Sequence, residues 1–149
     1  MEADASSTLT VPAAFDALPR CTSFVANFAS TAGFPADRLN EIELIVEEIV
    51  ANICRYGYGE RPGTLQICCR HQEHQRLELL FIDEGRPFNI LDLPTPQLTV
   101  DLDDREVGGL GVPLVRGLIE RASYHREGER NLLRLTIDAR RPGAATNAG

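Results

Sequence analysis

Glu48 and Asn52 lie four residues apart within an apolar stretch of the chain. In a helix of about 3.6 residues per turn, such a pair projects side by side from neighbouring turns. Glu41 falls on the same stripe, along one border of the apolar face that would pack on a core. A carboxylate and an amide at that border indicate a site, although a solvated acidic flank of an ordinary amphipathic helix has the same spacing.

Two further stretches contain residues suited to ligand binding. Asp83 ends an apolar, β-prone run and is followed at once by a turn that contains Gly85. Residues 108–111 are rich in glycine and precede a segment with helical spacing, so they offer free N–H groups and a helix dipole to an anion. Every one of the 15 basic residues is Arg, so only Arg, backbone N–H groups or a metal ion could contact a phosphate.

The composition indicates one globular domain. Of the 149 residues, 43% are hydrophobic and 25% are charged, which suffices for one core but not comfortably for two. The formal net charge of -7 argues against nucleic acid or an anionic membrane surface as the main partner, because an acidic field attracts neither. A basic protein, or a nucleotide carried with a metal ion, remains compatible with this charge.

The first residues of the chain predict no targeting segment. They lack the positive and apolar regions of a secretory signal, and no apolar run approaches the roughly 18 residues of a membrane-spanning helix. We therefore expect a cytoplasmic protein. The four cysteines show no C-x-x-C spacing and are interpreted as small buried apolar side chains, with Cys68 and Cys69 on opposite faces of one strand.

Hydrophobic periodicity predicts one strand and two helices in the first part of the chain. Residues 7–11 alternate like an edge strand, and residues 19–33 repeat at helical spacing. Asp37 is expected to cap a second, longer helix that runs to about Tyr56. The apolar face of that helix comprises Leu39, Ile42, Ile45, Val46, Ile49, Val50 and Ile53.

Two hairpins are predicted in the second part of the chain. Residues 64–70 and 76–83 are β-prone runs joined by a polar turn, and residues 123–126 and 131–137 form a second such pair. The first turn is polar (residues 71–75), and the second, at residues 127–130, contains Gly128. The domain is therefore expected to contain about five strands.

The segments that connect these elements carry further predictions. His71 and His74 are placed in the first hairpin turn and are expected to be solvated. Residues 89–107 show no period, which is typical of a functional lid or a disordered segment. Residues 112–121 have helical spacing, and residues 141–149 are expected to be disordered.

In their order along the chain, the three stretches resemble the N, G1 and G2 boxes of the GHKL ATPase superfamily. The closer resemblance is to the anti-sigma-factor serine/threonine kinases of bacterial partner-switching systems. It rests on the motifs Glu48-Ile-Val-Ala-Asn52, Asp83-Glu-Gly85 and the closing Arg130-Asn131-Leu-Leu-Arg-Leu. The resemblance covers residues 7–138, which we take as the ATPase domain, with residues 1–6 and 139–149 as flexible termini.

This resemblance implies an α/β two-layer sandwich, the Bergerat or histidine-kinase-like ATPase fold. Three helices are expected to cover one face of a mixed, mostly antiparallel sheet, with ATP between the helix layer and the lid. The other face of the sheet, or the first helix and strand, would be free for a homodimer or a partner protein.

The resemblance also implies roles for particular residues. Glu48 would be the general base that takes the proton from the attacking hydroxyl. Asn52 would bind the Mg²⁺ that bridges the phosphates of ATP. Asp83 would accept a hydrogen bond from the adenine amino group, and Gly85 would let the base come close. Asn131 stands near the adenine, where relatives often carry Thr.

The phosphates are assigned by the same resemblance to the glycine-rich stretch. Gly109 and Gly111 would cradle them, and Arg105 would add a charge from the lid. Two departures from the family pattern concern the lid geometry and the partner. Arg55-Tyr56 occupies a region where many relatives carry His, and Pro113 lies in the first turn after the glycines.

Three functions are compatible with this resemblance. One is a serine/threonine kinase that phosphorylates an anti-sigma-factor antagonist and, when free of it, sequesters a sigma factor or similar regulator. The second is a non-catalytic module that binds ATP and acts by sequestration alone. The presence of both Glu48 and Asn52 favours the kinase, because binding alone needs no base. The third, a histidine-kinase catalytic fragment, is disfavoured because no phosphoacceptor helix precedes the domain in this sequence.

Overall fold

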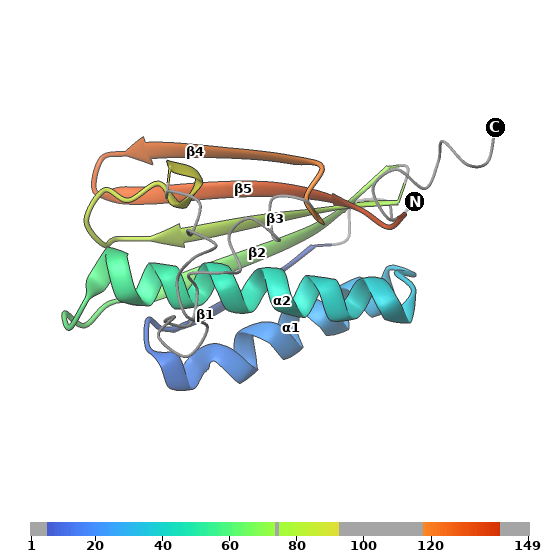
Figure 1. The fold of residues 1–149 in the computed structure, drawn as a ribbon, viewed down its shortest axis with the longest axis horizontal. Helices are drawn as coiled ribbons and strands as arrows, with labels where there is room; N and C mark the ends of the chain where they lie inside the picture. The colour runs from blue at the N-terminus through green and yellow to red at the C-terminus, as the bar shows by residue number, and fades with distance from the viewer. Residues whose placement is uncertain (1–5, 74, 93–117, 141–149) are drawn as a thin grey trace, which may run out of the picture.

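The computed structural model describes residues 6–73, 75–92 and 118–140. Within these residues, two helices lie on one face of a five-stranded sheet (Figure 1). The predicted two-layer α/β sandwich is therefore confirmed. Of the termini predicted to be flexible, residues 1–5 and 141–149 lie outside the described residues.

A mixed, mostly antiparallel sheet was predicted, and every strand pairing that the structure describes is antiparallel. Its strand order is β1-β2-β3-β5-β4, so the N-terminal strand lies at an edge, as predicted. Both predicted hairpins are present as β2–β3 and β4–β5. The strands are β1 (Ser6–Pro12), β2 (Thr64–Gln72), β3 (Arg76–Asp83), β4 (Arg121–Glu127) and β5 (Arg130–Asp138).

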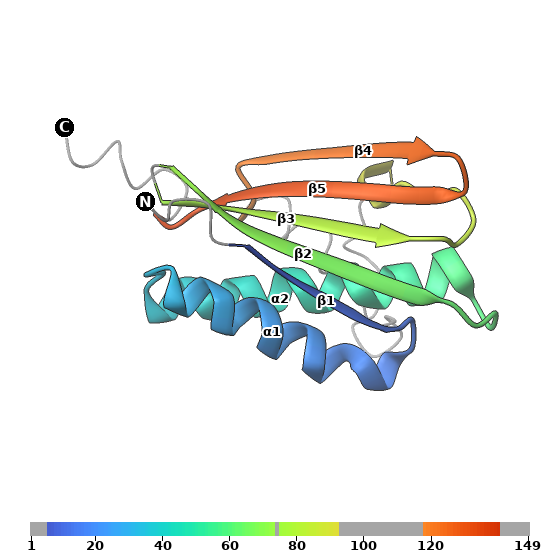
Figure 2. The same ribbon diagram turned by 180° about the vertical axis from the view of Figure 1, so that it is seen from behind.

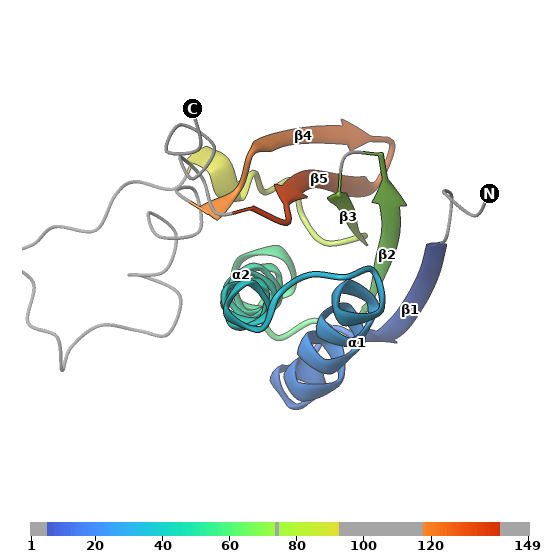
Figure 3. The ribbon, with the colours of Figure 1, turned by 90° about the vertical axis from the view of Figure 1, so that its right-hand side faces the viewer.

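The helix layer consists of α1 (Leu18–Thr31) and α2 (Ala36–Asn52), and the same helix layer is seen from behind in Figure 2. Figure 3 shows the sheet curving around both helices. α2 continues directly into a π-helical segment, η3 (Ile53–Tyr58). Of the seven residues predicted to form the apolar face of the long second helix, all but Leu39 are buried. Most of the predicted third helix lies outside the described residues.

At one end of the sheet, the last inward-facing residue of β3 and the first inward-facing residue of β5 are both polar. β3 buries Leu77, Leu79 and Phe81 and then Asp83, because side chains alternate between the two faces of a strand. β5 begins its buried series with Asn131, which lies directly across from Asp83 in the register. This pairing brings two side chains far apart in sequence to one corner beside α2.

Two predicted helix ends are wrong. Pro35, not Asp37, is the N-cap of α2, and Asp37 lies within the first helical turn. The helix predicted to run to Arg121 has Leu118 as its last helical residue, and β4 begins at Arg121. The reason is pairing with β5, since the Glu120 N–H already donates to the Thr136 carbonyl (2.9 Å).

Two predicted connecting segments also differ in the structure. His71 belongs to strand β2, opposite Leu77, and not to the turn. Its side chain is half-buried, and its Nε2 atom is buried with no hydrogen-bond partner among the described residues, so it is not fully solvated as predicted. His74 and residues 93–107 of the predicted lid lie outside the described residues. The start of that lid is ordered as a short 3-10 helix, η4 (Ile90–Asp92), in which Ile90 is buried. Among the helices that the structure describes, none combines the length and apolar character needed to span a bilayer.

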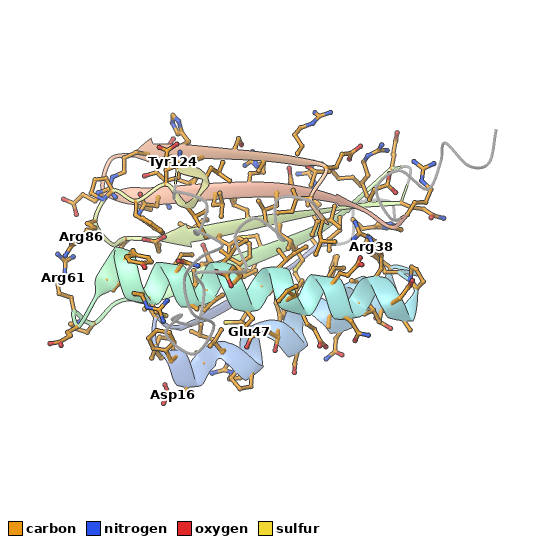
Figure 4. All side chains as sticks on the ribbon, viewed as in Figure 1. Asp16, Arg38, Glu47, Arg61, Arg86 and Tyr124 are labelled. Carbon is orange, nitrogen blue, oxygen red and sulfur yellow. The ribbon has the colours of Figure 1, made fainter. Side chains whose placement is uncertain are left out.

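Arg38 holds the far end of the two layers together. It lies at the opposite end of α2 from Tyr124 and Arg86 (Figure 4) and is 1% exposed. Its Nε donates to the Asp138 carbonyl (3.0 Å), and its Nη2 donates to the Leu118 carbonyl (3.1 Å). Arg38 also pairs with Glu41. A buried cation is tolerated here because its donors have acceptors.

We expect Arg38→Met to reduce the free energy of unfolding by about 2–4 kcal/mol, because it leaves buried acceptors without a donor. Urea denaturation of the variant and the parent measures this difference. Arg20→Met is the matched control, since Arg20 is exposed on α1. A change for Arg38→Met no larger than for Arg20→Met would show that the network does not stabilise the fold.

Candidate functional site

Glu48 and Asn52 are both buried on α2 and are hydrogen-bonded to each other. Glu48 is 5% exposed and Asn52 is 1% exposed. The Nδ2 group of Asn52 donates to Glu48 Oε2 (2.9 Å) and to the Glu48 backbone carbonyl (2.7 Å). Both amide hydrogens are therefore used, and Asn52 Oδ1 accepts no hydrogen bond from the described residues. An amide oxygen in this state suits a hard cation such as Mg²⁺.

The carboxyl group of Glu48 has a raised pKa. Desolvation by burial raises it most, while the hydrogen bond from Asn52 and the charge of Arg55 lower it. A carboxylate whose pKa is raised toward neutrality is a better proton acceptor than an exposed one. The pair is therefore not the solvated acidic flank that its spacing alone would allow.

A cavity of about 260 Å³ opens beside Glu48. Its walls are mostly apolar and come from α2, from η4, from strands β4 and β5, and from Ile119 and Glu120 just before β4. A largely apolar pocket with few polar groups is the usual form of a small-molecule site. The base predicted from sequence thus lies in the wall of a real cavity.

Asp83 is 4% exposed. Only one of its two carboxylate oxygens accepts hydrogen bonds from the described residues. Its Oδ1 accepts hydrogen bonds from the Gly85 N–H (2.9 Å) and from Asn131 Nδ2 (2.9 Å). Its Oδ2 accepts none from the described residues. Burial raises the pKa of Asp83, and the two hydrogen bonds and the charge of Arg126 lower it.

Gly85 is packed against the end of the helix that carries Glu48 and Asn52. A Cβ atom at this position would lie 2.5 Å from the Gly57 carbonyl oxygen, so any other residue would force the backbones apart. The same carbonyl accepts a hydrogen bond from the Arg86 N–H (2.9 Å). Glycine is thus required for helix–turn packing, and its predicted role in admitting a base stays a prediction.

Tyr58 also holds the end of η3 against the turn after β3. No role was predicted for this residue from the sequence. Its hydroxyl accepts from the Glu84 N–H (2.7 Å) and donates to the Thr64 carbonyl (2.7 Å). Its ring fills the space where a Cβ of Gly63 would be, 2.1 Å away. Tyr58 ends the π-helical segment η3, and π-helical segments are frequent at functional sites. No periodicity in the sequence indicates a π-helix.

A second, small cavity of about 10 Å³ lies at Asp83 and Asn131. It shares Ile90 and Leu133 with the larger cavity at Glu48. A purine does not fit in 10 Å³, so nucleotide binding here requires side chains such as Ile90 to move apart. Because Ile90 borders both cavities, movement of this side chain would change the shape of both.

Four of the eight predicted site residues lie at or beside these cavities. Glu48 lines the larger cavity, Asp83 and Asn131 line the smaller one, and Asn52 is hydrogen-bonded to Glu48. Gly85 lies two residues after Asp83, and its N–H donates to Asp83 Oδ1. Arg105, Gly109 and Gly111 lie outside the described residues, so their assigned contacts with phosphate stay predictions.

Tyr124 and Arg126 of β4 also reach this corner and were missed. Both donate hydrogen bonds to Asn131 Oδ1, the second at 3.1 Å. The sequence held a signal for them, because the hairpin turn at residues 127–130 puts Arg126 opposite Asn131.

Comparison with known proteins identifies the class. The family model described as the histidine kinase-like ATPase domain matches residues 11–137. The chain belongs to the histidine kinase-like ATPase family, and the predicted family is confirmed. Membership implies ATP as the ligand of the domain.

Two relatives indicate a branch of that family. The serine-protein kinase RsbW of Halalkalibacterium halodurans is 26% identical over 123 residues, which make up 80% of this chain and 75% of that protein. The anti-sigma F factor of Clostridium acetobutylicum is 23% identical over 103 residues, 69% of this chain and 71% of that protein.

A solved structure supports the fold. The blue-light activated histidine kinase of Erythrobacter litoralis EL346 superposes with a TM-score of 0.54 at 16% sequence identity. The match covers 80% of this chain and 42% of that kinase. At this identity, the similarity supports the fold alone.

We expect Glu48→Gln to stabilise the protein at neutral pH. Because burial raises the pKa of Glu48, its contribution to stability is present below the ordinary value of 4.5 and is lost as the pH rises through the raised pKa. Glutamine keeps the hydrogen bond to Asn52 without a buried charge. We expect a Tm increase of a few degrees at pH 7.5, where 1 kcal/mol corresponds to about 2–5 °C in a domain of this size.

The increase should shrink at pH 4, where Glu48 is mostly neutral in both the folded and the unfolded state. Thermal unfolding followed by circular dichroism measures it, with Glu43→Gln on the exposed face of α2 as the control. A Tm for Glu48→Gln at or below that of the parent at pH 7.5 would contradict the assigned cost of burying this carboxylate.

Proposed function

We propose that the protein is an ATP-dependent serine/threonine kinase of the anti-sigma-factor type. The observation that carries this proposal is the buried carboxyl group of Glu48, which lies in the wall of a cavity, accepts a hydrogen bond from Asn52 and has a raised pKa. A module that only binds nucleotide has no need of a buried base, and keeping an unneutralised carboxylate there costs stability.

The base of ATP binds at Asp83. An ionised Asp83 Oδ2 accepts a hydrogen bond from the adenine amino group, whereas the guanine carbonyl oxygen in the same place would face a second acceptor. The apolar side chains of Ile53, Ile90 and Leu133 around Asp83 supply the surface for a flat ring. In this proposal Ile90 moves aside to admit the ring.

Asn52 Oδ1 binds the Mg²⁺ that accompanies ATP. When bound, the ion neutralises charge on the phosphates during transfer. The hydrogen bonds from Asn52 Nδ2 to Glu48 fix which end of the amide is free for the ion. Gly109, Gly111 and Arg105 complete the phosphate site in this proposal, as the family resemblance implies.

Glu48 acts as the general base. It takes the proton from the acceptor hydroxyl of a serine or threonine as that oxygen attacks the γ-phosphorus. The bond from this phosphorus to the β–γ bridging oxygen breaks, and ADP leaves. The hydrogen bond from Asn52 holds Glu48 Oε2, so the other carboxylate oxygen is available to the hydroxyl.

The substrate we propose is an anti-sigma-factor antagonist in the cytoplasm, and the regulator sequestered in its absence is a sigma factor or a similar protein. The names of the two relatives support this choice. We also propose a homodimer. Leu80, Ile82 and Leu132 lie half-buried on the sheet face that the helices leave uncovered, where a second protein surface could cover them.

We expect the parent protein to bind ATP more tightly than GTP and Asp83→Asn to lose most of that preference. Asparagine is isosteric and retains one acceptor oxygen, so the fold is kept while the carboxylate is lost. Titration calorimetry with both nucleotides measures the ratio of the dissociation constants. Equal affinity of the parent for ATP and GTP would remove Asp83 from the base site.

Two variants on α2 distinguish a kinase from a module that only sequesters a partner. Glu48→Gln keeps shape and loses the proton acceptor, so Mg-ATP binding should persist while phosphotransfer to the antagonist falls by about 10²–10⁴-fold. Asn52→Ala removes the proposed metal ligand, so it should weaken Mg-ATP binding as well as turnover. Calorimetry and transfer of radiolabelled phosphate give the two readouts.

If Glu48→Gln transfers phosphate at the same rate as the parent protein, Glu48 is not the base. If the parent binds Mg-ATP but transfers no phosphate to its native antagonist, the non-catalytic ATP-binding module replaces the kinase.

A further inference from the structure

Asn131 has no hydrogen-bonding capacity left for a nucleotide. The hydrogens of its Nδ2 group go to Asp83 Oδ1 (2.9 Å) and to the Arg86 carbonyl (2.8 Å). Its Oδ1 accepts from the Tyr124 hydroxyl, from Arg126 Nη1 (3.1 Å) and, at a longer distance, from the Phe88 N–H (3.4 Å). An amide offers two hydrogens and two lone pairs, so all four positions are occupied by protein groups.

Arg126 links the same amide to the turn after β3. Its Nη1 also donates to the Gly85 carbonyl (2.9 Å), and its Nε donates to the Gly128 carbonyl (3.1 Å) within its own hairpin. The guanidinium is thus held rigidly at the corner where Asp83 lies, and its charge lowers the pKa of that carboxyl.

The two oxygens of Asp83 are consequently unequal. Oδ1 is occupied by two N–H donors, from Gly85 and Asn131, while Oδ2 accepts nothing from the described residues. When Asp83 is ionised, Oδ2 is an acceptor and suits the amino group of adenine. When Asp83 is protonated, its hydroxyl is a donor and suits the carbonyl of guanine.

The other groups that face Asp83 do not supply a charge at neutral pH. Cys54 and Tyr58 of η3 interact electrostatically with it, and burial raises the pKa of both, so both are neutral. Glu84, the next residue in the chain, is exposed. Among the described residues, the cation that offsets the burial of Asp83 is Arg126.

We propose that Arg126 and Asn131 are positioning residues that set the preference for adenine over guanine, by directing Asp83 Oδ2 toward the base and keeping it ionised. This rests on the proposed function and goes beyond it, since specificity is assigned to the β4–β5 hairpin as well as to Asp83. Neither residue needs to touch the nucleotide.

The test compares Arg126→Met, which keeps the length of the side chain but removes its charge, with Arg126→Lys, which keeps the charge. Dissociation constants for ATP and GTP are measured by calorimetry at pH 6 and pH 8. For Arg126→Met we expect the GTP-to-ATP ratio of these constants to fall by about 3–10-fold at pH 6. Because a higher pH favours the ionised carboxylate, the ratio should fall less at pH 8 than at pH 6.

Arg126→Lys should stay within about twofold of the parent at both pH values. Arg134→Met is the matched control, because Arg134 lies on β5 with a half-exposed side chain and pairs with Glu78, away from this corner. It should leave both constants unchanged. Asn131→Ala should lower the ratio more than Arg126→Met does; if Asn131→Ala does not fold, the two Arg126 variants decide.

Equal loss of ATP and GTP affinity in Arg126→Met, with an unchanged ratio at both pH values, would overturn the inference and leave Arg126 a structural role. The two proposals fail separately. A parent without preference for ATP contradicts the proposed function. A parent whose preference is abolished by Asp83→Asn but unaffected by Arg126→Met and Asn131→Ala contradicts this inference alone.

Discussion

The contact between the Gly57 carbonyl and the turn at Gly85–Arg86 is the constraint on which the site depends. One carbonyl at the end of the long helix accepts the Arg86 N–H and leaves no room for a side chain at Gly85. Because the helix is rigid, fixing its end to the end of β3 also fixes the distance from Asn52 to Asp83. A residue larger than glycine would move Asn52 away from Asp83, and its Cβ atom would also lie only 3.1 Å from Asp83 Oδ1.

Buried polar groups at this junction cost free energy, and the structure offsets the cost with hydrogen bonds instead of removing the groups. Asn52 holds Glu48, and Asn131 holds Asp83, so each carboxylate has an amide partner that occupies one of its oxygens. The other oxygen of each carboxylate is left for a ligand. Both carboxyls nevertheless keep a raised pKa. This is the pattern expected where stability is given up for chemistry.

Periodicity alone was sufficient to predict α2, its apolar face and both hairpins, because each pattern matches the geometry of one element. Glu48, Asn52 and Asp83 could be selected because they break those patterns at element borders. Tyr58 and Arg38 could not be selected. Their roles arise from a π-helical segment and from backbone carbonyls of distant residues, Asp138 and Leu118 for Arg38, which leave no local signal. The helix predicted to end at Arg121 failed for a similar reason, since pairing with β5 overrides local preference.

The proposed site requires that one nucleotide reaches from Asp83 to Asn52. A crystal structure of the protein with Mg²⁺ and a non-hydrolysable ATP analogue measures this directly. We predict the adenine amino group within hydrogen-bond distance of Asp83 Oδ2, the metal ion bound by Asn52 Oδ1, and Ile90 displaced from the small cavity beside Asp83. An adenine ring bound away from Asp83, or a metal ion held without Asn52, would contradict the site described for this protein.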